Sequence, residues 1–243
     1  SLHDALPISG CVGGGIFLKK VIDSAPDVTP EDVKPTGYTS VVYASDNKTE
    51  TQRLTSAGSN RVYKTIDEIP KDLQHAFVAI EDERFYEHNG IDPKGIVRAG
   101  MIGLTTGDFS QGASTLTQQL IKNNIFDFMS EDTFFDRLER KIQEQYLALK
   151  LEKQMSKSEI MENYLNTINL GQNTLGVQAA SQRYFNKDVS QLTLSESAVI
   201  AAITQSPSYY NPITHPDHNA DRRKQVLKNM LEQGYISQEA HDE

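Results

Sequence analysis

Residues 81–90 carry the sequence Glu-Asp-Glu-Arg-Phe-Tyr-Glu-His-Asn-Gly, which places four carboxylates, an arginine and a histidine before an Asn-Gly turn signal. The residues before this segment favour a helix, because Leu73, Phe77 and Ile80 recur at the spacing of one helical stripe. Continuing the period places Glu81 at the margin of the apolar stripe, whereas Asp82 points away from it. A carboxyl group at such a margin can act as an acid or base near neutral pH. The alternative at this point is an acidic helix end that faces water.

Composition limits the classes of function that the chain can serve. It has 243 residues, a formal net charge of -9 and a single cysteine, Cys11. This length fits one large domain, or one domain with appendages. The negative charge argues against a nucleic-acid-binding protein, so an anionic substrate needs a local cluster of basic side chains. A single cysteine allows neither an intrachain disulfide nor a cysteine metal site.

The N-terminal part differs in composition and hydrophobic pattern from the rest of the chain. Residues 1–20 contain an apolar and glycine-rich run that is shorter than the ~20 residues needed to span a bilayer. This run is either the stump of a transmembrane helix or a glycine-rich lead. Residues 21–60 are predicted to be a linker followed by a β-hairpin, with strands at 39–43 and 49–54. Nearly every segment after Pro70 favours a helix, so the sequence predicts a mostly α protein with a short β-hairpin near its N-terminus.

The segment 114–123 is predicted to be a helix with an unusual polar face. Serine and threonine are indifferent helix formers, so a helix that only faces water would more readily use glutamate and lysine. A row of hydroxyls and amides suits a polar ligand, and we expect a ligand-binding face here, with a solvent-facing helix as the alternative. The side chains concerned are Ser114, Thr115, Gln118, Gln119, Lys122 and Asn123.

Residues 136–154 are predicted to form the longest helix, with an apolar row in its C-terminal half that includes Leu147. Traced back along the helix, this row reaches Glu144 and then Arg140, with Lys141 on its flank. Charges that continue a buried row must be paired or functional. A plain ion pair between neighbouring turns is the structural alternative.

Phenylalanines gather in the segment 125–135 before this helix. Such a segment fits either an ordinary core or a surface that dips into a membrane. The pattern alone favours the core.

Two later helix starts carry a capping box, in which a hydroxyl residue and a glutamate three positions on satisfy each other's backbone groups. They lie at 156–159 and 193–196, where the sequences are Ser-Lys-Ser-Glu and Thr-Leu-Ser-Glu. We therefore expect helices to begin directly after Ser156 and Thr193.

Four motifs occur in one order along the chain. They are Glu-Asp-x-x-Phe-x-x-His-x-Gly at 81–90, Gly-x-Ser-Thr-x-Thr-Gln-Gln at 112–119, Arg-Lys-x-x-Glu at 140–144 and Lys-x-Glu-Ile-x-Glu-x-Tyr-Leu-Asn at 157–166. Together they closely resemble glycosyltransferase family 51, the peptidoglycan glycosyltransferase domain of class A penicillin-binding proteins and monofunctional transglycosylases. One such motif is a weak signal, whereas four in order are specific.

The resemblance implies limits for the domain and an outline of its fold. It covers roughly residues 30–236, and we expect the glycosyltransferase domain at 61–236 and the start of a truncated continuation at 237–243. The implied fold is mostly α, with a lysozyme-like large lobe and a smaller membrane-associated lobe. This family context favours a lipid-facing surface for the phenylalanine-rich segment and a membrane-helix stump at the N-terminus. We find no Ser-x-x-Lys motif that supports an acyl-serine transpeptidase, because the spacing occurs only at 45–48, in the predicted turn of the β-hairpin.

The resemblance also implies a reaction, its substrates and its place in the cell. The family polymerises lipid II outside the cytoplasmic membrane, using glycan linked to undecaprenyl pyrophosphate as the donor and the 4-hydroxyl of incoming lipid II as the nucleophile, with inversion. Such a transfer needs a base on the hydroxyl and positive charge at the departing pyrophosphate. The expected partners are these two lipids, the cytoplasmic membrane and proteins of a cell-wall synthesis complex, with no nucleic acid. The expected location is the extracytoplasmic side of the cell membrane, with the single-pass anchor truncated in this sequence.

Motif by motif, the resemblance assigns roles to individual residues. Glu81 would be the base, and Glu144 a second carboxylate that positions substrate or holds a divalent cation such as Mg²⁺ or Mn²⁺. The pyrophosphate would be gripped by Lys122, Arg140 and Lys141. Donor sugar or phosphate groups would be bound by Thr115, Gln119 and Asn123, beside the polar face that includes Ser114 and Gln118. The residues that shape the substrate site would be Asp82, Phe85 and His88.

Two other functions compete with this interpretation. A lysozyme-like hydrolase also uses two carboxylates on a glycan, but it does not need the cationic set Lys122, Arg140 and Lys141 for an uncharged substrate. An inactive cell-wall scaffold would have no use for Glu81 and Glu144 on apolar helix rows. The sequence therefore favours the glycosyltransferase.

Overall fold

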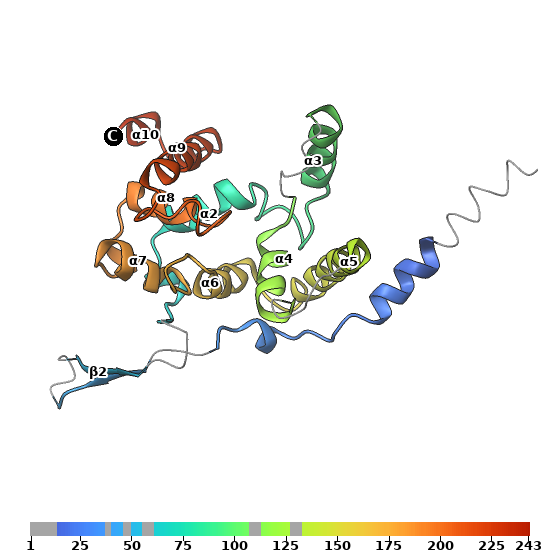
Figure 1. The fold of residues 1–243 in the computed structure, drawn as a ribbon, viewed down its shortest axis with the longest axis horizontal. Coiled ribbons are helices and arrows are strands. Elements are labelled where there is room, and N and C mark those ends of the chain that lie inside the picture. Colours follow the sequence, from blue (N-terminus) through green and yellow to red (C-terminus); the bar gives the residue numbers. More distant parts are fainter. Residues whose placement is uncertain (1–13, 37–39, 46–49, 55–60, 107–112, 127–132) are drawn as a thin grey trace, which may run out of the picture.

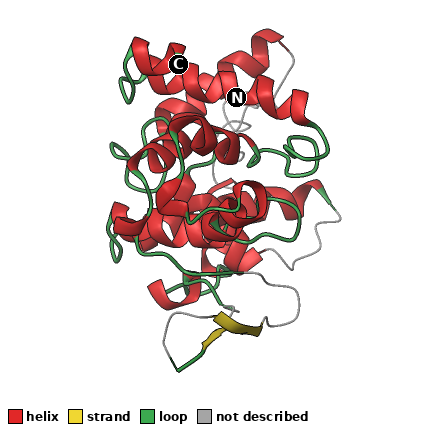
Figure 2. Cartoon of the chain, turned by 90° about the vertical axis from the view of Figure 1, so that its left-hand side faces the viewer, coloured by secondary structure: helices red, strands yellow, loops and turns green. Residues whose placement is uncertain are grey.

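The computed structural model describes residues 14–36, 40–45, 50–54, 61–106, 113–126 and 133–243. Helices account for most of these residues, which confirms the mostly α prediction (Figure 2). The α-helices are α2 (Lys71–Glu81), α3 (Pro93–Thr106), α4 (Leu116–Ile121), α5 (Phe134–Leu151), α6 (Lys157–Thr167), α7 (Val177–Phe185), α8 (Leu194–Ala202), α9 (Pro216–Glu232) and α10 (Gln238–Asp242). Shorter helical turns are η1 (Pro30–Val33), η2 (Ile66–Glu68), η3 (Lys122–Phe126) and η4 (Val189–Gln191). Residues 14–23 are also helical, and the first part of the 1–20 segment lies outside the described residues.

Two short strands lie where the sequence predicts the β-hairpin. Strands β1 (Ser40–Tyr43) and β2 (Glu50–Leu54) pair antiparallel, with Ser40 opposite Leu54 and Tyr43 opposite Glu50. The register is irregular between Val42 and Tyr43. Figure 1 shows this pair projecting from the helical body, so the strands lie apart from the helices that carry the predicted site.

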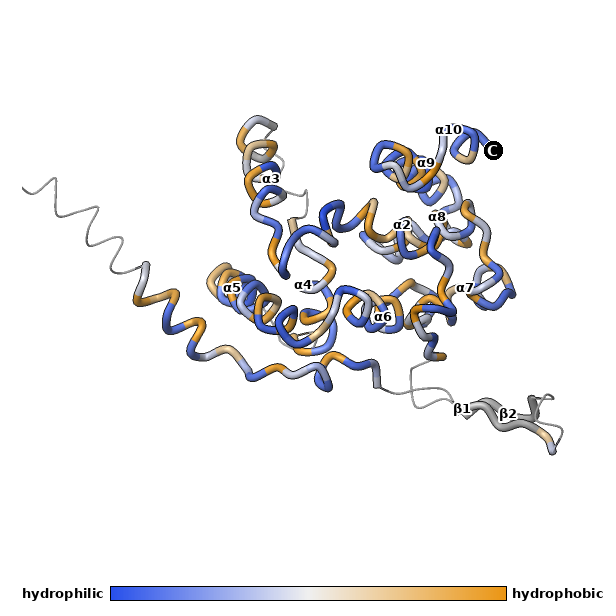
Figure 3. The backbone as a smooth tube through the Cα atoms, turned by 180° about the vertical axis from the view of Figure 1, so that it is seen from behind, coloured by the Kyte–Doolittle hydropathy of each residue, from blue (hydrophilic) through white to orange (hydrophobic). Residues whose placement is uncertain are grey.

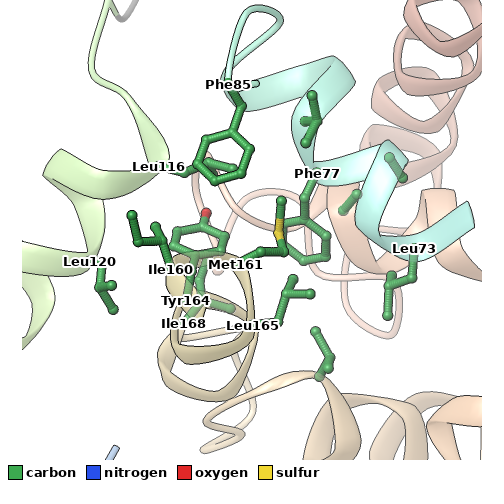
Figure 4. Packing of buried hydrophobic residues seen from close by; sticks show 14 of the residues in the cluster. Leu73, Phe77, Phe85, Leu116, Leu120, Ile160, Met161, Tyr164, Leu165 and Ile168 are labelled. Carbon is green, nitrogen blue, oxygen red and sulfur yellow. The ribbon is translucent and has the colours of Figure 1, made fainter. Parts of the chain in front are cut away.

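Helix α6 lies at the centre of the hydrophobic core. Its side chains Ile160, Tyr164 and Leu165 are fully buried, together with Phe77 of α2 and Leu116 of α4, and Figure 4 shows these residues gathered around Tyr164. The rings of Phe77 and Tyr164 meet edge to face with centroids 5.8 Å apart. Burial of each large apolar side chain stabilises the fold by ~1.5–3 kcal/mol. This packing holds the end of α2 against the start of α4.

Local hydrogen bonding sets the helix starts, as the capping boxes predict. The hydroxyl of Ser156 accepts the backbone N–H of Glu159 at the start of α6. The hydroxyl of Thr193 accepts the backbone N–H of Glu196 at the start of α8. Both predicted helix starts are confirmed, because each motif satisfies its own backbone donors without help from distant residues.

Gly90 lets the connection between α2 and α3 pass very close to α5. Its φ is +100°, and a Cβ added there would lie 2.6 Å from the carbonyl oxygen of Ala148. A side chain at this position therefore requires the backbone to move. The carbonyl oxygen of Gly90 accepts the hydroxyl of Thr115 at 2.7 Å. The segment 81–90 is thereby fixed between α4 and α5.

Helix α3 stands apart from the other helices in Figure 1, and polar contacts tie its first half to the body. Arg84 lies 2.6 Å from Asp92, just before α3, and Arg98 lies 2.9 Å from Glu83. The helix carries apolar residues along its length (Figure 3), and Leu104 is 82% exposed. Across the described ranges, every helix is either too short or too polar to cross a bilayer.

The N-terminal segment runs along helix α5. The amide of Gln143 donates to the carbonyl oxygen of Val21 at 3.2 Å, and Lys150 pairs with Asp27 at 2.9 Å. Val21 is buried at this contact, whereas residues 14–20 are exposed. The segment therefore contacts the body from Val21 onwards, and its residues Val28 and Val33 belong to the main hydrophobic core.

Candidate active site

A cavity of about 480 Å³ opens between the end of α2, helices α4 and α5, and the chain that follows α6 and α8. Its wall brings together most of the side chains predicted for the site. These are Glu81, Ser114, Gln118, Gln119, Lys122, Asn123, Lys141 and Glu144. The cavity therefore combines two carboxylates, a row of amides and a set of cations, contributed mainly by α2, α4, η3 and α5.

Glu81 is the last residue of α2 and is partly exposed in this cavity. The hydroxyl of Thr204 donates to its Oε1 atom, and the amide Nε2 of Gln119 donates to its Oε2 atom at 2.9 Å. Both donors are neutral, so they hold the carboxylate in place without cancelling its charge. A carboxylate held in this way can take a proton from a bound hydroxyl group.

Gln119 is held from behind by Tyr164 of helix α6. The hydroxyl of Tyr164 donates to the Oε1 atom of Gln119 at 3.1 Å. Burial, together with the charges of Glu81 and Asp82, raises the pKa of Tyr164 well above its usual value. The hydroxyl therefore keeps its proton and remains a donor throughout the neutral range.

The second carboxylate, Glu144, lies on α5 and is 1% exposed. Its Oε1 atom accepts the guanidinium of Arg140, and its Oε2 atom accepts the ammonium of Lys141 at 2.8 Å. Lys141 also donates to the hydroxyl of Ser114 at 3.1 Å, and Lys122 is exposed on the same wall. This end of the cavity therefore carries a local positive charge on a chain whose net charge is -9. Such a cluster fits an anionic group.

A second cavity of about 720 Å³ shares Ile80, Glu81, Gln205 and Arg222 with the first. Helix α9 and its C-terminal cap contribute carboxamides to its wall, namely Gln225, Asn229 and Gln233, beside the carboxylates of Asp82, Glu83 and Glu232. Carboxamides donate and accept hydrogen bonds, so this wall suits the hydroxyl and N-acetyl groups of sugars. Glu81 thus lies where a cationic cavity meets an amide-lined one.

Five residues predicted for the site do not line the cationic cavity, namely Asp82, Phe85, His88, Thr115 and Arg140. Asp82 and His88 form a buried pair, in which His88 Nε2 lies 2.9 Å from a carboxylate oxygen of Asp82. The backbone N–H of Gly90 donates to His88 Nδ1 at 3.1 Å, so the ring carries its proton on Nε2. Asp82 also accepts the backbone N–H of Leu116 at 2.9 Å. The pair therefore ties the end of α2 to the start of α4.

Phe85 and Thr115 are buried behind the cavity wall, and neither side chain lines the cationic cavity. The ring of Phe85 lies beneath the ammonium of Lys157, 4.5 Å from its centroid. The hydroxyl of Thr115 caps α4 by accepting the backbone N–H of Gln118 at 3.2 Å. Both residues shape the wall from behind, because packing and capping already occupy their side chains.

A family model described as Transglycosylase matches residues 47–231. The chain belongs to the transglycosylase family. The matched range includes both cavity carboxylates and the cationic cluster beside Glu144. The family resemblance carried by the four sequence motifs is thereby confirmed.

The transglycosylase relatives are penicillin-binding proteins. The chain is 49% identical over 183 residues to penicillin-binding protein 1A of Escherichia coli, covering 75% of this chain and 21% of that protein. It is 48% identical over 178 residues to penicillin-binding protein 1F of Bacillus subtilis, covering 73% and 24% of the two chains. It is 41% identical over 240 residues to penicillin-binding protein 1A of Clostridium botulinum, covering 95% and 28%. The chain spans about a quarter of the length of these relatives.

The polar lining residues of the transglycosylase cavity that have no role assigned by the motifs include Thr204, Gln205 and Arg222. Thr204 and Gln205 come just after Ile203, which caps the buried apolar helix α8, and such a polar pair beyond a core helix is a usable signal. The Nε atom of Arg222 is buried and has no hydrogen-bond partner within the described part of the chain. Arg222 and Glu81 line the same cavity only because of the fold, since 141 positions of sequence separate the two residues.

The side chains described around Glu144 do not form a metal site from protein ligands alone. Within the described ranges, no group of three or more histidine, cysteine, aspartate or glutamate side chains could hold a metal ion. Both carboxylate oxygens of Glu144 already face a cation. Mg²⁺ and similar ions require several oxygen ligands and are repelled by neighbouring positive charge. In this structure Glu144 holds Arg140 and Lys141 in place, a role that differs from both expected roles.

Proposed function

We propose that this chain polymerises lipid II into peptidoglycan glycan strands as an inverting glycosyltransferase. The donor is the growing glycan linked to undecaprenyl pyrophosphate, and the acceptor is the 4-hydroxyl of incoming lipid II. The family assignment gives the class of reaction, and the two cavities at Glu81 give each substrate group a matching surface.

The proposed step moves one proton and exchanges one bond. Glu81 takes the proton of the 4-hydroxyl as its oxygen attacks the anomeric carbon of the donor. The bond between that carbon and the pyrophosphate oxygen breaks, and the pyrophosphate leaves with the electron pair. Lys141, Arg140 and Lys122 stabilise the negative charge on the leaving group. Glu144 keeps the first two of these cations in place.

The observation that carries the proposal is the position of Glu81 between a cationic cavity and an amide-lined one. A hydrolase of uncharged glycan has no leaving group that needs the cations around Glu144. A polymerase that expels a pyrophosphate needs them at this place.

Incubation of the protein with purified lipid II tests the proposal. We expect polymeric glycan, with one undecaprenyl pyrophosphate released for each bond formed. Cleavage of preformed glycan without release of this lipid would instead support the hydrolase. Absence of both reactions would support the scaffold.

We also propose that the apolar surface formed by α3 and the start of α5 faces the membrane, as the smaller lobe beside a lysozyme-like larger one. Val97, Met101 and Leu104 are 62%, 63% and 82% exposed, and Phe134 and Phe135 are 65% and 67% exposed. An exposed apolar surface of this kind marks a membrane or protein contact. Co-sedimentation with lipid vesicles should decrease when Leu104 is changed to glutamate, and unchanged binding would argue against this orientation.

The remaining expectations from the family extend beyond this chain. We propose that residues 61–236 form the catalytic domain, that it acts on the extracytoplasmic side of the cell membrane, and that proteins of the cell-wall synthesis complex bind it. The divalent cation remains a prediction, and chelation by EDTA during the polymerisation assay tests it.

A further inference from the structure

The carboxylate of Glu81 is held by a chain of hydrogen bonds that ends deep in the core. Its Oε2 atom accepts the amide of Gln119 at 2.9 Å, and the oxygen of that amide accepts the hydroxyl of Tyr164 at 3.1 Å. Glu81, Gln119 and Tyr164 belong to α2, α4 and α6, so the chain of contacts joins three helices.

The direction of each hydrogen bond follows from the chemistry of the groups. An ionised carboxylate only accepts, so the NH₂ group of Gln119 must face Glu81 and its oxygen must face Tyr164. If the amide were reversed, two oxygens would meet at Glu81. Tyr164 donates in the observed arrangement, and its raised pKa keeps the proton on the hydroxyl.

Packing in the core fixes the side chain of Tyr164. Its side chain is fully buried, and its ring packs edge to face against Phe77 (Figure 4). The cationic cavity is lined by Gln119 but not by Tyr164. Tyr164 therefore affects substrate only through the amide in front of it.

We propose that Tyr164 is a positioning residue for the catalytic base: it fixes the amide of Gln119, which in turn fixes the carboxylate of Glu81. This inference rests on the proposed function, and it gives Gln119 a different role from donor-sugar binding. Both ends of the Gln119 amide are already occupied by protein groups in the resting site. Thr204 holds the other carboxylate oxygen without involving Tyr164.

The change Tyr164→Phe removes one hydroxyl and keeps the ring that fills the core. The amide of Gln119 can then rotate, so the carboxylate is less well oriented towards the 4-hydroxyl. We expect kcat for lipid II polymerisation to fall roughly 10-fold to 100-fold, with KM unchanged, because misplacement by about an ångström has effects of this size.

A double-mutant cycle separates this role from a purely structural one. Gln119→Leu removes the amide, and adding Tyr164→Phe to it should cause no further loss of kcat. In the Thr204→Val background, Tyr164→Phe should still lower kcat by the same factor, because the contact of Thr204 with Glu81 does not involve Tyr164. Gln119→Leu alone also tests the chain of contacts if Tyr164→Phe fails to fold, with the same fall in kcat and unchanged KM expected.

Two results would overturn the inference. One is a kcat for folded Tyr164→Phe within twofold of wild type. The other is a double variant, Gln119→Leu/Tyr164→Phe, whose fall in kcat equals the product of the falls in the two single variants. Failure of the proposed function itself looks different, because the unsubstituted protein would then form no polymer from lipid II.

Discussion

The two carboxylates of the cationic cavity are held in opposite ways. Glu81 is partly exposed and receives hydrogen bonds from a neutral amide and a neutral hydroxyl. Glu144 is 1% exposed and receives its hydrogen bonds from a guanidinium and an ammonium. The residue type is the same, but the first carboxylate keeps its negative charge while the charge of the second is neutralised.

This difference separates two tasks that a glycosyl transfer requires. Neutral donors fix the position of a carboxylate and leave it able to accept a proton, as a base must. Cations around a buried carboxylate are instead held in place by it, and they remain available to an incoming anion. The contrast predicts that Glu81 matters for turnover, whereas Glu144 matters for both stability and the cationic cluster.

The largest expected effect is on turnover at Glu81. The change Glu81→Gln removes the proton acceptor but keeps the shape, so polymerisation should fall by at least about 10³-fold. Glu87→Gln, an exposed change in the same segment that lines neither cavity, is the matched control and should keep wild-type turnover. Turnover of Glu81→Gln near the control value would remove Glu81 from the role of base.

The next effect is on stability at Glu144. Replacing it by glutamine leaves Arg140 and Lys141 beside an amide, and we expect the free energy of unfolding to fall by about 2–4 kcal/mol. The loss lies below that of a fully buried pair, because the Lys141 side chain is 43% exposed. Denaturant unfolding measures it, with Glu139→Gln on the same helix expected within ~0.5 kcal/mol of wild type. Equal stability of Glu144→Gln and the control would contradict the stabilising role of Glu144.

A smaller effect is expected when one cation is removed. The change Lys141→Ala should weaken binding of the pyrophosphate-linked donor about tenfold, while stability changes by less than ~1 kcal/mol, since the side chain is partly exposed. Lys150→Ala, on the same helix but paired with Asp27 away from the cavity, should leave donor affinity unchanged. Equal donor affinity in the two variants would show that the cluster does not grip the pyrophosphate.

The smallest expected effect concerns stability at alkaline pH, and it arises from Tyr164, the buried residue behind Glu81. The pKa of Tyr164 is raised by burial, so its stabilising contribution is complete below the unfolded-state pKa of about 10 and is lost as pH rises further. One such group contributes up to ~1.4 kcal/mol per pH unit. Tyr164→Phe should reduce this slope without removing it, because burial also raises the pKa of Tyr86, Tyr184 and Tyr235. An unchanged slope in stability measured from pH 9 to 12 would contradict the assignment.

The parts of this fold that depend on neighbouring residues are predictable from the sequence. The stripe of Leu73 and Phe77 is buried as its spacing indicates, and Ser156 and Thr193 start helices through contacts three residues away. The row from Leu147 back to Glu144 is buried for the same reason, because helical periodicity fixes which side chains share a face.

Contacts between distant segments account for what the sequence does not reveal. Periodicity directs Asp82 away from the core, but the helix ends at Glu81, and Asp82 turns inward to meet His88 and the start of α4. Thr204 joins Glu81 across 123 positions, and no local pattern encodes that meeting. Thr115 is polar because it caps α4, a role that resembles a ligand face when only composition is considered.

The most direct test of the two-carboxylate account measures donor affinity and turnover side by side in Glu81→Gln and Lys141→Ala. The account predicts opposite patterns: Glu81→Gln binds the pyrophosphate-linked donor within about threefold of wild type but loses turnover by at least about 10³-fold. Lys141→Ala loses affinity for the donor about tenfold and keeps turnover at saturating donor within about threefold of wild type. Loss of affinity and turnover in equal proportion in both variants would contradict the division of roles between Glu81 and the cations held by Glu144.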